Sequence, residues 1–125
     1  MIRFTKIDHV AVMIPTGQQA AARQFYGQLL QLKEIPGQHP RNAIWYEIAD
    51  IQLHLVEEES TTGLPSGRHP AFEVESLEAA KAYLQSNGVA IAYTSKIEGR
   101  ERAFFRDPFG NRVEMIEFDK EFEKV

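Results

Sequence analysis

The feature that most constrains the fold of this chain is an internal repeat with a period of 60 residues. Four pairs of residues keep this spacing: His9 and His69, Ala11 and Ala71, His54 and Glu114, and Glu57 and Glu117. A fixed period of this kind indicates that one supersecondary unit occurs twice. Because a unit of this length buries too little surface for a stable core of its own, we expect the two copies to pack together.

Each copy is predicted to contain a strand, a helix and three further strands, which makes the fold class α+β. Runs of β-branched and apolar residues predict strands over residues 7–14, 43–48, 51–57, 68–74, 89–94, 102–106 and from residue 111 onward. Thr16 is expected to cap a helix over residues 17–30, and a second helix is expected over residues 77–86. We therefore expect module one at about 4–57, a polar linker at 58–67, module two at about 68–117 and a tail at 118–125, all in a single domain of 125 residues.

A tight turn is predicted between the last two strands. Asp107 and Gly110 stand at the first and fourth positions of a type I turn, and Pro108 presets the backbone angle at the second. One strand should therefore end near Arg106 and its antiparallel partner begin near Asn111.

A two-residue hairpin is predicted at residues 49–50. This turn places Trp45 opposite His54 on the paired strand. Because side chains alternate along a strand, Leu53 and Leu55 should face the core and His54 the other side.

The same alternation turns three histidines and one glutamate away from the core, namely His9, His54, His69 and Glu114. If the modules curl into a cup, these side chains converge. Imidazole and carboxylate groups suit a divalent transition metal such as Zn, Ni, Fe, Mn or Co, and two histidines with one carboxylate form the facial set of non-haem Fe(II) enzymes. The fourth histidine, His39, lies in a loop between two prolines and is expected to be exposed to solvent.

Composition excludes several other classes of function. The net charge is −4 and no basic run is interleaved with aromatic residues, so we expect neither a nucleic-acid partner nor an acidic membrane. The chain has no cysteine, which removes disulfides and thiolate sites. Residues 1–10 do not resemble a signal peptide and no apolar run reaches membrane-spanning length, so a cytoplasmic location is expected.

Four segments together resemble the vicinal oxygen chelate superfamily, the group of glyoxalase I, methylmalonyl-CoA epimerase, extradiol dioxygenases and the fosfomycin-resistance and bleomycin-binding proteins. They are Asp8-His9-Val10-Ala11-Val12, Leu53-His54-Leu55, His69-Pro70-Ala71-Phe72 and Asp107-Pro108-Phe109-Gly110-Asn111-Arg112-Val113-Glu114. The resemblance runs from about residue 4 to 117. It implies two βαβββ modules forming an eight-strand cup, one divalent metal held by His9, His69 and Glu114, a substrate that chelates the metal through neighbouring oxygens, and commonly a homodimer.

Details of the sequence separate the members of this superfamily. The position of His54 is usually Glu in glyoxalase I and Gln in the epimerase, so a fourth ligand stays possible, with Glu114 as the only carboxylate. Fosfomycin-type enzymes carry Thr where this chain has Ala11, which disfavours that group. Bleomycin-binding proteins lack the metal residues. The dioxygenases use three ligands and often a nearby His as acid or base, a role that His54 could take.

These observations leave three hypotheses open. The first is a metal-dependent lyase or isomerase, in which the metal stabilises the oxyanion that develops when a proton leaves carbon next to a carbonyl. The second is an Fe(II) extradiol-type dioxygenase, and the third is a non-enzymatic protein that sequesters a small molecule. Glu114 and His54 are the candidate catalytic residues, with Glu47 and Glu73 as alternative bases.

Four further residues are candidates for contact with the substrate. Trp45 is expected to give the pocket an apolar wall, and Phe104 shares a strand face with Arg102. Arg100 and Arg102 could bind a substrate carboxylate or phosphate.

Overall fold

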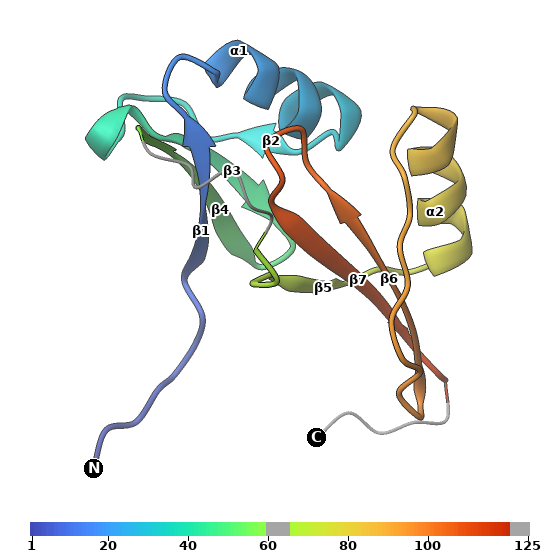
Figure 1. Cartoon of the computed structure of the whole chain (residues 1–125). Helices are drawn as coiled ribbons and strands as arrows, with labels where there is room; N and C mark the ends of the chain where they lie inside the picture. Colours follow the sequence, from blue (N-terminus) through green and yellow to red (C-terminus); the bar gives the residue numbers. More distant parts are fainter. Residues whose placement is uncertain (60–65, 121–125) are drawn as a thin grey trace. The chain divides into compact units, whose positions relative to one another are not determined.

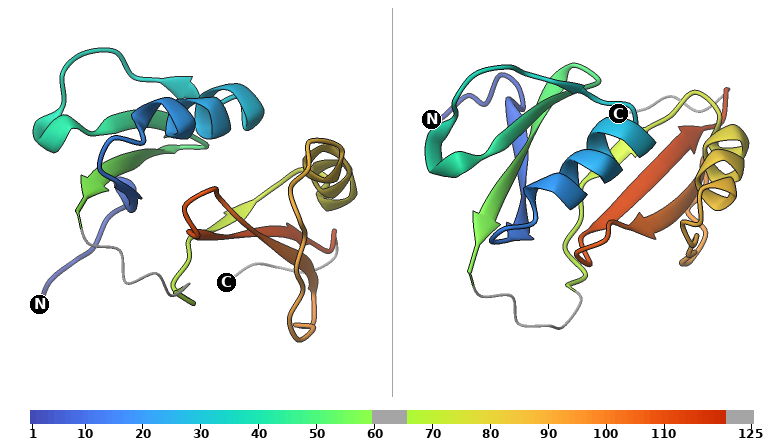
Figure 2. Two further views of the ribbon diagram at one scale, coloured as in Figure 1. Left: turned by 45° about the horizontal axis from the view of Figure 1, so that its top comes forward. Right: turned by 90° about the horizontal axis from the view of Figure 1, so that it is seen from above.

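The computed structural model describes residues 1–59 and 66–120 and divides into two compact units, Met1–Leu64 and Pro65–Val125. Each unit has its own sheet with a helix over one face (Figures 1 and 2). Residues 60–65 of the expected linker and 121–125 of the expected tail lie outside the described residues. In the described part of the chain, no helix is long and apolar enough to cross a membrane.

The first unit is a four-stranded sheet with one helix. Its elements are β1 (His9–Pro15), α1 (Gln19–Ala22), η1 (Arg23–Leu29), β2 (Lys33–Glu34), η2 (Pro40–Asn42), β3 (Ile44–Ile48) and β4 (Ile51–Glu58). The strand order is β1-β4-β3-β2, with β1 parallel to β4 and the other neighbours antiparallel. The short strand β2 was not predicted.

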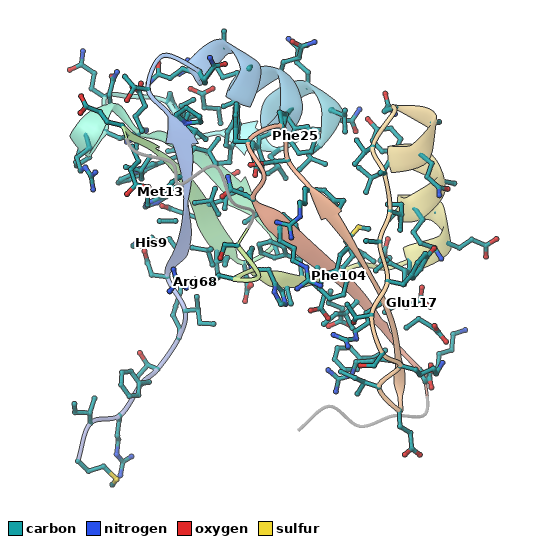
Figure 3. The ribbon with its side chains drawn as sticks, in the orientation of Figure 1. His9, Met13, Phe25, Arg68, Phe104 and Glu117 are labelled. Atoms are coloured by element: carbon teal, nitrogen blue, oxygen red, sulfur yellow. The ribbon has the colours of Figure 1, made fainter. Side chains whose placement is uncertain are left out.

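The core of this unit lies between the helix and one face of the sheet. The buried apolar strand residues alternate onto that face: Val12, Ile14, Ile44, Tyr46, Leu53 and Leu55. Phe25 of η1 (Figure 3) is buried, and so is its neighbour Tyr26, whose ring centroid lies 6.3 Å from that of Tyr46. The prediction that Leu53 and Leu55 face the core is confirmed, and His54 points to the opposite face.

The first helix differs from the prediction in both its start and its form. Thr16 is not the cap, because the helix begins at Gln19 after Gln18, which makes no side-chain capping bond. From Arg23 to Leu29 the helix is a π-helix. Each turn of a π-helix holds more residues than an α-helix, so the spacing of apolar residues along the sequence could not show it.

The second unit is a three-stranded sheet with one helix. Its elements are β5 (Ala71–Glu73), α2 (Leu77–Ser86), β6 (Arg100–Arg106) and β7 (Arg112–Phe118), in the strand order β5-β7-β6. The predicted helix over residues 77–86 is confirmed, with Ser76 as its cap and Gly88 in the left-handed conformation after its end.

Two predicted strands of this unit are shorter in the structure. The strand expected over 68–74 is reduced to three residues, because Pro70 has no N–H to donate to a ladder. The strand expected over 89–94 is wrong: only Ala92 pairs, through two backbone hydrogen bonds of 2.8 Å with Phe104. The described residues therefore contain seven named strands rather than eight.

The turn between β6 and β7 is confirmed. The N–H of Gly110 donates to the carbonyl of Asp107 at 3.1 Å, and Gly110 has φ of +91°. The Asp107 carboxylate also accepts bonds from the backbone N–H groups of Phe109 and Asn111. These bonds fix the register of β7 and so the position of Glu114 along it.

The repeat is visible in the register of the two sheets. In the first unit, Ala11 pairs with His54 across the parallel strands β1 and β4. In the second unit, Ala71 pairs with Glu114 across the parallel strands β5 and β7. The period of 60 residues is therefore a structural period, and it gives His54 and Glu114 equivalent positions in their sheets.

A pair of glutamates repeats the same relation on the other face. The N–H of Gly17 donates to Glu57 at 3.3 Å, and the N–H of Leu77 donates to Glu117 at 2.7 Å. Each glutamate is the second-last residue of the last strand of its unit and accepts a bond from the backbone at or just before the start of the helix. This contact ties the strand that carries His54 or Glu114 to the helix of the same unit.

Candidate metal centre and ring stack

Four aromatic rings form a continuous stack on the sheet face of the first unit that turns away from the helix. The ring centroids are 4.0 Å apart for His39 and Trp45, 4.1 Å for Trp45 and His54, and 4.1 Å for His54 and His9. The angles between ring planes are 10°, 2° and 12°. Strand register builds the inner part, because Trp45 and His54 are cross-strand partners, as predicted.

His39 was expected to be exposed, and this prediction is wrong. Its ring covers one face of Trp45, and its Nε2 lies 2.9 Å from the carbonyl of Ile35. Sequence reasoning missed this contact because His39 lies in a loop, where strand alternation gives no direction. The loop turns back over β3 through Arg41 and Asn42, which both have positive φ.

His54 is the most buried ring of the histidines, with 8% of the residue exposed. Burial, together with the nearby His9, lowers the pKa of His54, so the ring is neutral near pH 7. Its Nε2 lies 2.9 Å from the side-chain oxygen of Gln52. An amide oxygen only accepts, so the proton of the neutral ring is on Nε2 and its lone pair is on Nδ1.

His9 and His69 are both held through Nδ1. Nδ1 of His9 lies 2.9 Å from the carboxylate of Asp8, and Nδ1 of His69 lies 2.8 Å from the carbonyl of Gly67. Bonds from Nδ1 to an oxygen acceptor are the usual means by which proteins orient a histidine that binds a metal through Nε2. The same bond lowers the pKa of the Asp8 carboxyl. Sequence reasoning missed Asp8 as a partner of His9, although its place next to His9 was a signal.

Glu114 is buried in the middle of β7, with 4% of the residue exposed. One carboxylate oxygen lies 2.9 Å from Nε2 of His69, and the other lies 3.5 Å from a guanidinium nitrogen of Arg102. Nδ1 of His69 donates its hydrogen bond to the carbonyl of Gly67, so Nε2 of a neutral ring has a lone pair and no proton. Contact between this lone pair and the carboxylate oxygen therefore needs a cation. That cation is either a second proton on the ring or a metal ion.

The residues of the second unit fit a divalent metal. Two ligand atoms each about 2.1 Å from one ion and at a right angle to each other lie about 3 Å apart, which matches the 2.9 Å between His69 Nε2 and Glu114 Oε1. In neither unit do three His, Asp or Glu side chains among the described residues form a metal-binding group by themselves. Each unit brings together two of the four predicted ligands.

The residues of the first unit fit only in part. The lone pairs of an imidazole lie in the plane of its ring, and the planes of His9 and His54 are nearly parallel. Two stacked rings therefore direct their lone pairs along parallel planes and cannot both bind one ion. While the stack is intact, His9 is suited to bind a metal and His54 is not.

Three of the four predicted substrate-binding residues, Arg100, Arg102 and Phe104, alternate onto one face of β6 in the second unit. Phe104 (Figure 3) is cross-strand partner to Glu114. The guanidinium groups of Arg102 and Arg112 lie 5.5 Å and 3.9 Å from the centre of its ring. Arg100 lies on the same strand and packs over Phe118 at 4.6 Å. Sequence reasoning missed Arg112 and Phe118 as parts of this cluster, although alternation places Arg112 on the face of Glu114.

Two of these arginines have unused donors. The Nε atoms of Arg100 and Arg102 are buried and have no hydrogen-bond partner among the described residues. Arg102 is held by a bond of 2.8 Å from its Nη2 to the carbonyl of Ser95, and 16% of its side chain is exposed. A buried guanidinium donor without a partner is costly, which favours an anion as the missing acceptor.

The two alternative bases lie in more polar surroundings. The side chain of Glu47 is 56% exposed and lies 3.9 Å from Lys33. Glu73 is also exposed. Neither carboxylate is buried as Glu114 is.

Comparison with known proteins identifies the family. The sequence profile of the Glyoxalase/Bleomycin resistance protein/Dioxygenase superfamily matches residues 6–115. No curated protein matches. A solved structure described as a putative glyoxalase family protein from Bacillus anthracis is 31% identical, with a TM-score of 0.85 over 95% of this chain and 99% of that chain.

Two less similar structures share the fold. Lactoylglutathione lyase from Agrobacterium tumefaciens is 19% identical, with a TM-score of 0.71 over 90% of this chain and 93% of that chain. TnmS3, an antibiotic binding protein from a Streptomyces species, is 21% identical, with a TM-score of 0.74 over 95% of this chain and 100% of that chain. The α+β, glyoxalase-like fold expected from the sequence is thereby confirmed, and the chain belongs to the Glyoxalase/Bleomycin resistance protein/Dioxygenase superfamily.

Proposed function

We propose that this protein is a divalent-metal-dependent lyase or isomerase that removes a proton from carbon next to a carbonyl of a small, oxygen-chelating substrate. The observation that carries the proposal is the contact of 2.9 Å between His69 Nε2 and the buried Glu114 carboxylate. This pair requires a cation between its two atoms. A metal ion at this position would be a second counter-ion for the buried carboxylate, beside Arg102, which lies 3.5 Å from its other oxygen.

Three residues are proposed as the metal ligands: His9, His69 and Glu114. The Nδ1 bonds of the two histidines support this choice, since both leave Nε2 as the nitrogen for a metal. His54 is left out of the set because it stacks on His9. Three protein ligands leave positions for water or for two oxygens of a substrate.

His54 is proposed as the base. A bound divalent ion would supply the Lewis acid that stabilises negative charge on the substrate oxygen. Gln52 holds the Nε2 proton of His54, so the Nδ1 lone pair is the group that accepts a proton from the substrate. The rings of Trp45 and His9 on either side keep His54 in one orientation. Glu114 then acts as ligand and counter-ion.

Arg100 and Arg102 are proposed to bind an anionic group of the substrate. Their buried Nε donors lack partners among the described residues, and Arg102 is held in place through Ser95. A carboxylate or phosphate would satisfy these donors. We therefore expect a substrate that carries such a group in addition to its chelating oxygens.

The first experiment measures the metal content of protein purified without chelator. Wild type should retain about one ion per chain, and His69→Ala and Glu114→Ala should lose it. His54→Phe keeps a ring in the stack and should retain the metal, while activity is lost. Glu73→Ala, on the same sheet face as Glu114, is the matched control and should behave as wild type.

The same variants separate this proposal from its competitors. Loss of metal in His54→Phe would return His54 to the ligand set and remove it as the base. Wild type that stays empty after reconstitution with Zn, Ni, Fe, Mn and Co would exclude the enzyme and leave a protein that sequesters small molecules.

A second candidate is an Fe(II)-dependent extradiol-type dioxygenase. The observation that favours it is the stacking of His54 on His9, which leaves two histidines and one carboxylate as ligands with a third histidine beside them. The identity of the retained metal decides between the two. Iron together with oxygen consumption on catechols supports the dioxygenase, and zinc or nickel with proton exchange next to a carbonyl supports the lyase or isomerase.

The resemblance to the superfamily also implies a homodimer, and we propose this state for the protein. Sedimentation equilibrium of the purified protein tests this directly, and a mass of one chain at micromolar concentration would exclude it.

A further inference from the structure

Three rings of the stack come from the strands of the sheet. Trp45, His54 and His9 stand on three adjacent strands, β3, β4 and β1, whose backbone pairing sets the distance between them. One face of Trp45 is covered by His54, and the planes of these two rings differ by only 2°. The other face of Trp45, which we call the outer face, is covered by the ring at the end of the stack.

His39 is the ring that covers the outer face, and it is held differently from the other three. It comes from the loop between β2 and β3 rather than from a strand. Besides the stacking contact, its imidazole has one hydrogen bond, between Nε2 and the carbonyl of Ile35. The loop contains three residues with positive φ, Gly37, Arg41 and Asn42. Left-handed conformations of non-glycine residues are unfavourable, so this loop gains little from its own backbone geometry.

We propose that the outer face of Trp45 binds a planar, conjugated ring of the substrate, and that this ring replaces His39. An aromatic or heteroaromatic ring has the thickness and flat shape of the imidazole that lies there now, at 4.0 Å and 10°. The proposal deepens the proposed function by naming the substrate class and rests on it for the statement that the ring belongs to a substrate. Binding of the ring itself needs neither the metal nor turnover.

Replacement of His39 has a measurable consequence. A ligand that must displace His39 breaks one stacking contact of the protein. Its apparent affinity is therefore the intrinsic affinity multiplied by the fraction of molecules in which the outer face is uncovered. Removal of the imidazole in His39→Ala should therefore tighten binding of a planar ring between about twofold and about tenfold, which is the equilibrium equivalent of one aromatic contact. A residue that served only to fasten the loop would have no such effect.

The test uses metal-free protein and 2-naphthoate as the planar probe, with decahydro-2-naphthoate as a saturated probe of equal charge. Isothermal titration should show tighter binding of 2-naphthoate to His39→Ala than to wild type, weaker binding to Trp45→Leu than to wild type, and no matching gain for the saturated probe. His39→Phe retains a ring over Trp45 and should bind no more tightly than wild type.

Nuclear magnetic resonance adds a direct readout at the covering ring. The carbon-bound ring protons of His39 lie over the indole and should resonate upfield in the free protein. They should move toward their ordinary positions as 2-naphthoate is added. Unchanged or weaker binding in a folded His39→Ala variant, no measurable binding in either protein, or binding without movement of the His39 resonances would each overturn the proposal.

The two proposals fail separately. If the metal is absent but 2-naphthoate displaces His39, the ring site stands and the enzyme does not. If the metal is present but His39→Ala gains nothing, the enzyme stands and its substrate does not place a flat ring on Trp45.

Discussion

Glu117 ties the strand that carries Glu114 to helix α2, and its removal should destabilise the second unit. The N–H of Leu77, the first residue of α2, donates to the Glu117 carboxylate at 2.7 Å in a partly buried place. A hydrogen bond to a charged group contributes about 1.5–3 kcal/mol, and a negative charge at a helix N-terminus adds about 0.3–1 kcal/mol. Because other groups and water take over part of the interaction, we expect Glu117→Ala to lower the free energy of unfolding by about 2 kcal/mol.

The repeat supplies an internal control for this prediction. Glu57 occupies the equivalent position in the first unit, but its bond to the N–H of Gly17 is longer, at 3.3 Å, and exposed. Gly17 also lies before the helix, which begins at Gln19. Glu57→Ala should therefore cost at most about 0.5 kcal/mol, as expected for an exposed interaction. Glu117→Gln keeps an acceptor without the charge and should cost about 1 kcal/mol.

Urea unfolding followed by circular dichroism at pH 7 measures these differences. With a urea dependence of about 2 kcal/mol per M, Glu117→Ala should lower the midpoint by about 1 M and Glu57→Ala by no more than about 0.25 M. Equal shifts in the two variants would refute the assumption that length and burial of the bond determine its contribution. A shift for Glu117→Gln as large as that for Glu117→Ala would show that the charge is what matters.

Three further predictions concern the candidate site. Asp8→Asn removes the carboxylate that orients His9, so metal affinity measured by competition with a chelator should fall by about 10- to 100-fold; an unchanged affinity would argue against His9 as a ligand. Arg102→Gln leaves the buried Glu114 with His69 alone and should destabilise the protein by about 2–3 kcal/mol; adding Glu114→Gln should recover part of this loss in thermal or urea unfolding, and strict additivity of the two changes would contradict the ion pair. The lowered pKa of His54 means that the unfolded chain takes up a proton at a higher pH than the folded one. Stability of the metal-free protein should therefore be fully present above about pH 6.5, the ordinary value for histidine, and fall as the pH drops below it; His54→Phe should reduce this dependence in urea unfolding at a series of pH values.

Local patterns in the sequence were sufficient where each pattern has one geometric outcome. A run of helix-forming residues ended by Asn87 and Gly88 predicts a helix over 77–86, which is where α2 lies. The two-residue turn between Ile48 and Ile51 leaves one register for the hairpin, so the pairing of Trp45 with His54 could be predicted.

Sequence patterns failed where distant contacts decide the outcome. Residues 89–94 have the composition of a strand, yet only Ala92 bonds to β6. A strand needs a partner along its whole length, and composition does not report the course of that partner. Thr16 is a suitable cap by type, but the helix begins three residues later, and the neighbouring N–H of Gly17 donates to Glu57, forty residues away.

The candidate site shows the same division. The period of 60 residues and the alternation of strands, both properties of the sequence, were enough to choose His9, His54, His69 and Glu114 and to turn them away from the core. Only the tertiary structure decided how these side chains meet: His54 lies flat between the rings of His9 and Trp45, Glu114 is buried against His69 and Arg102, and His39 covers Trp45. The physical reason is that sequence spacing specifies the face on which a side chain lies. The angle between two rings, and the partner of a buried charge, are set by packing between segments that are far apart in the chain.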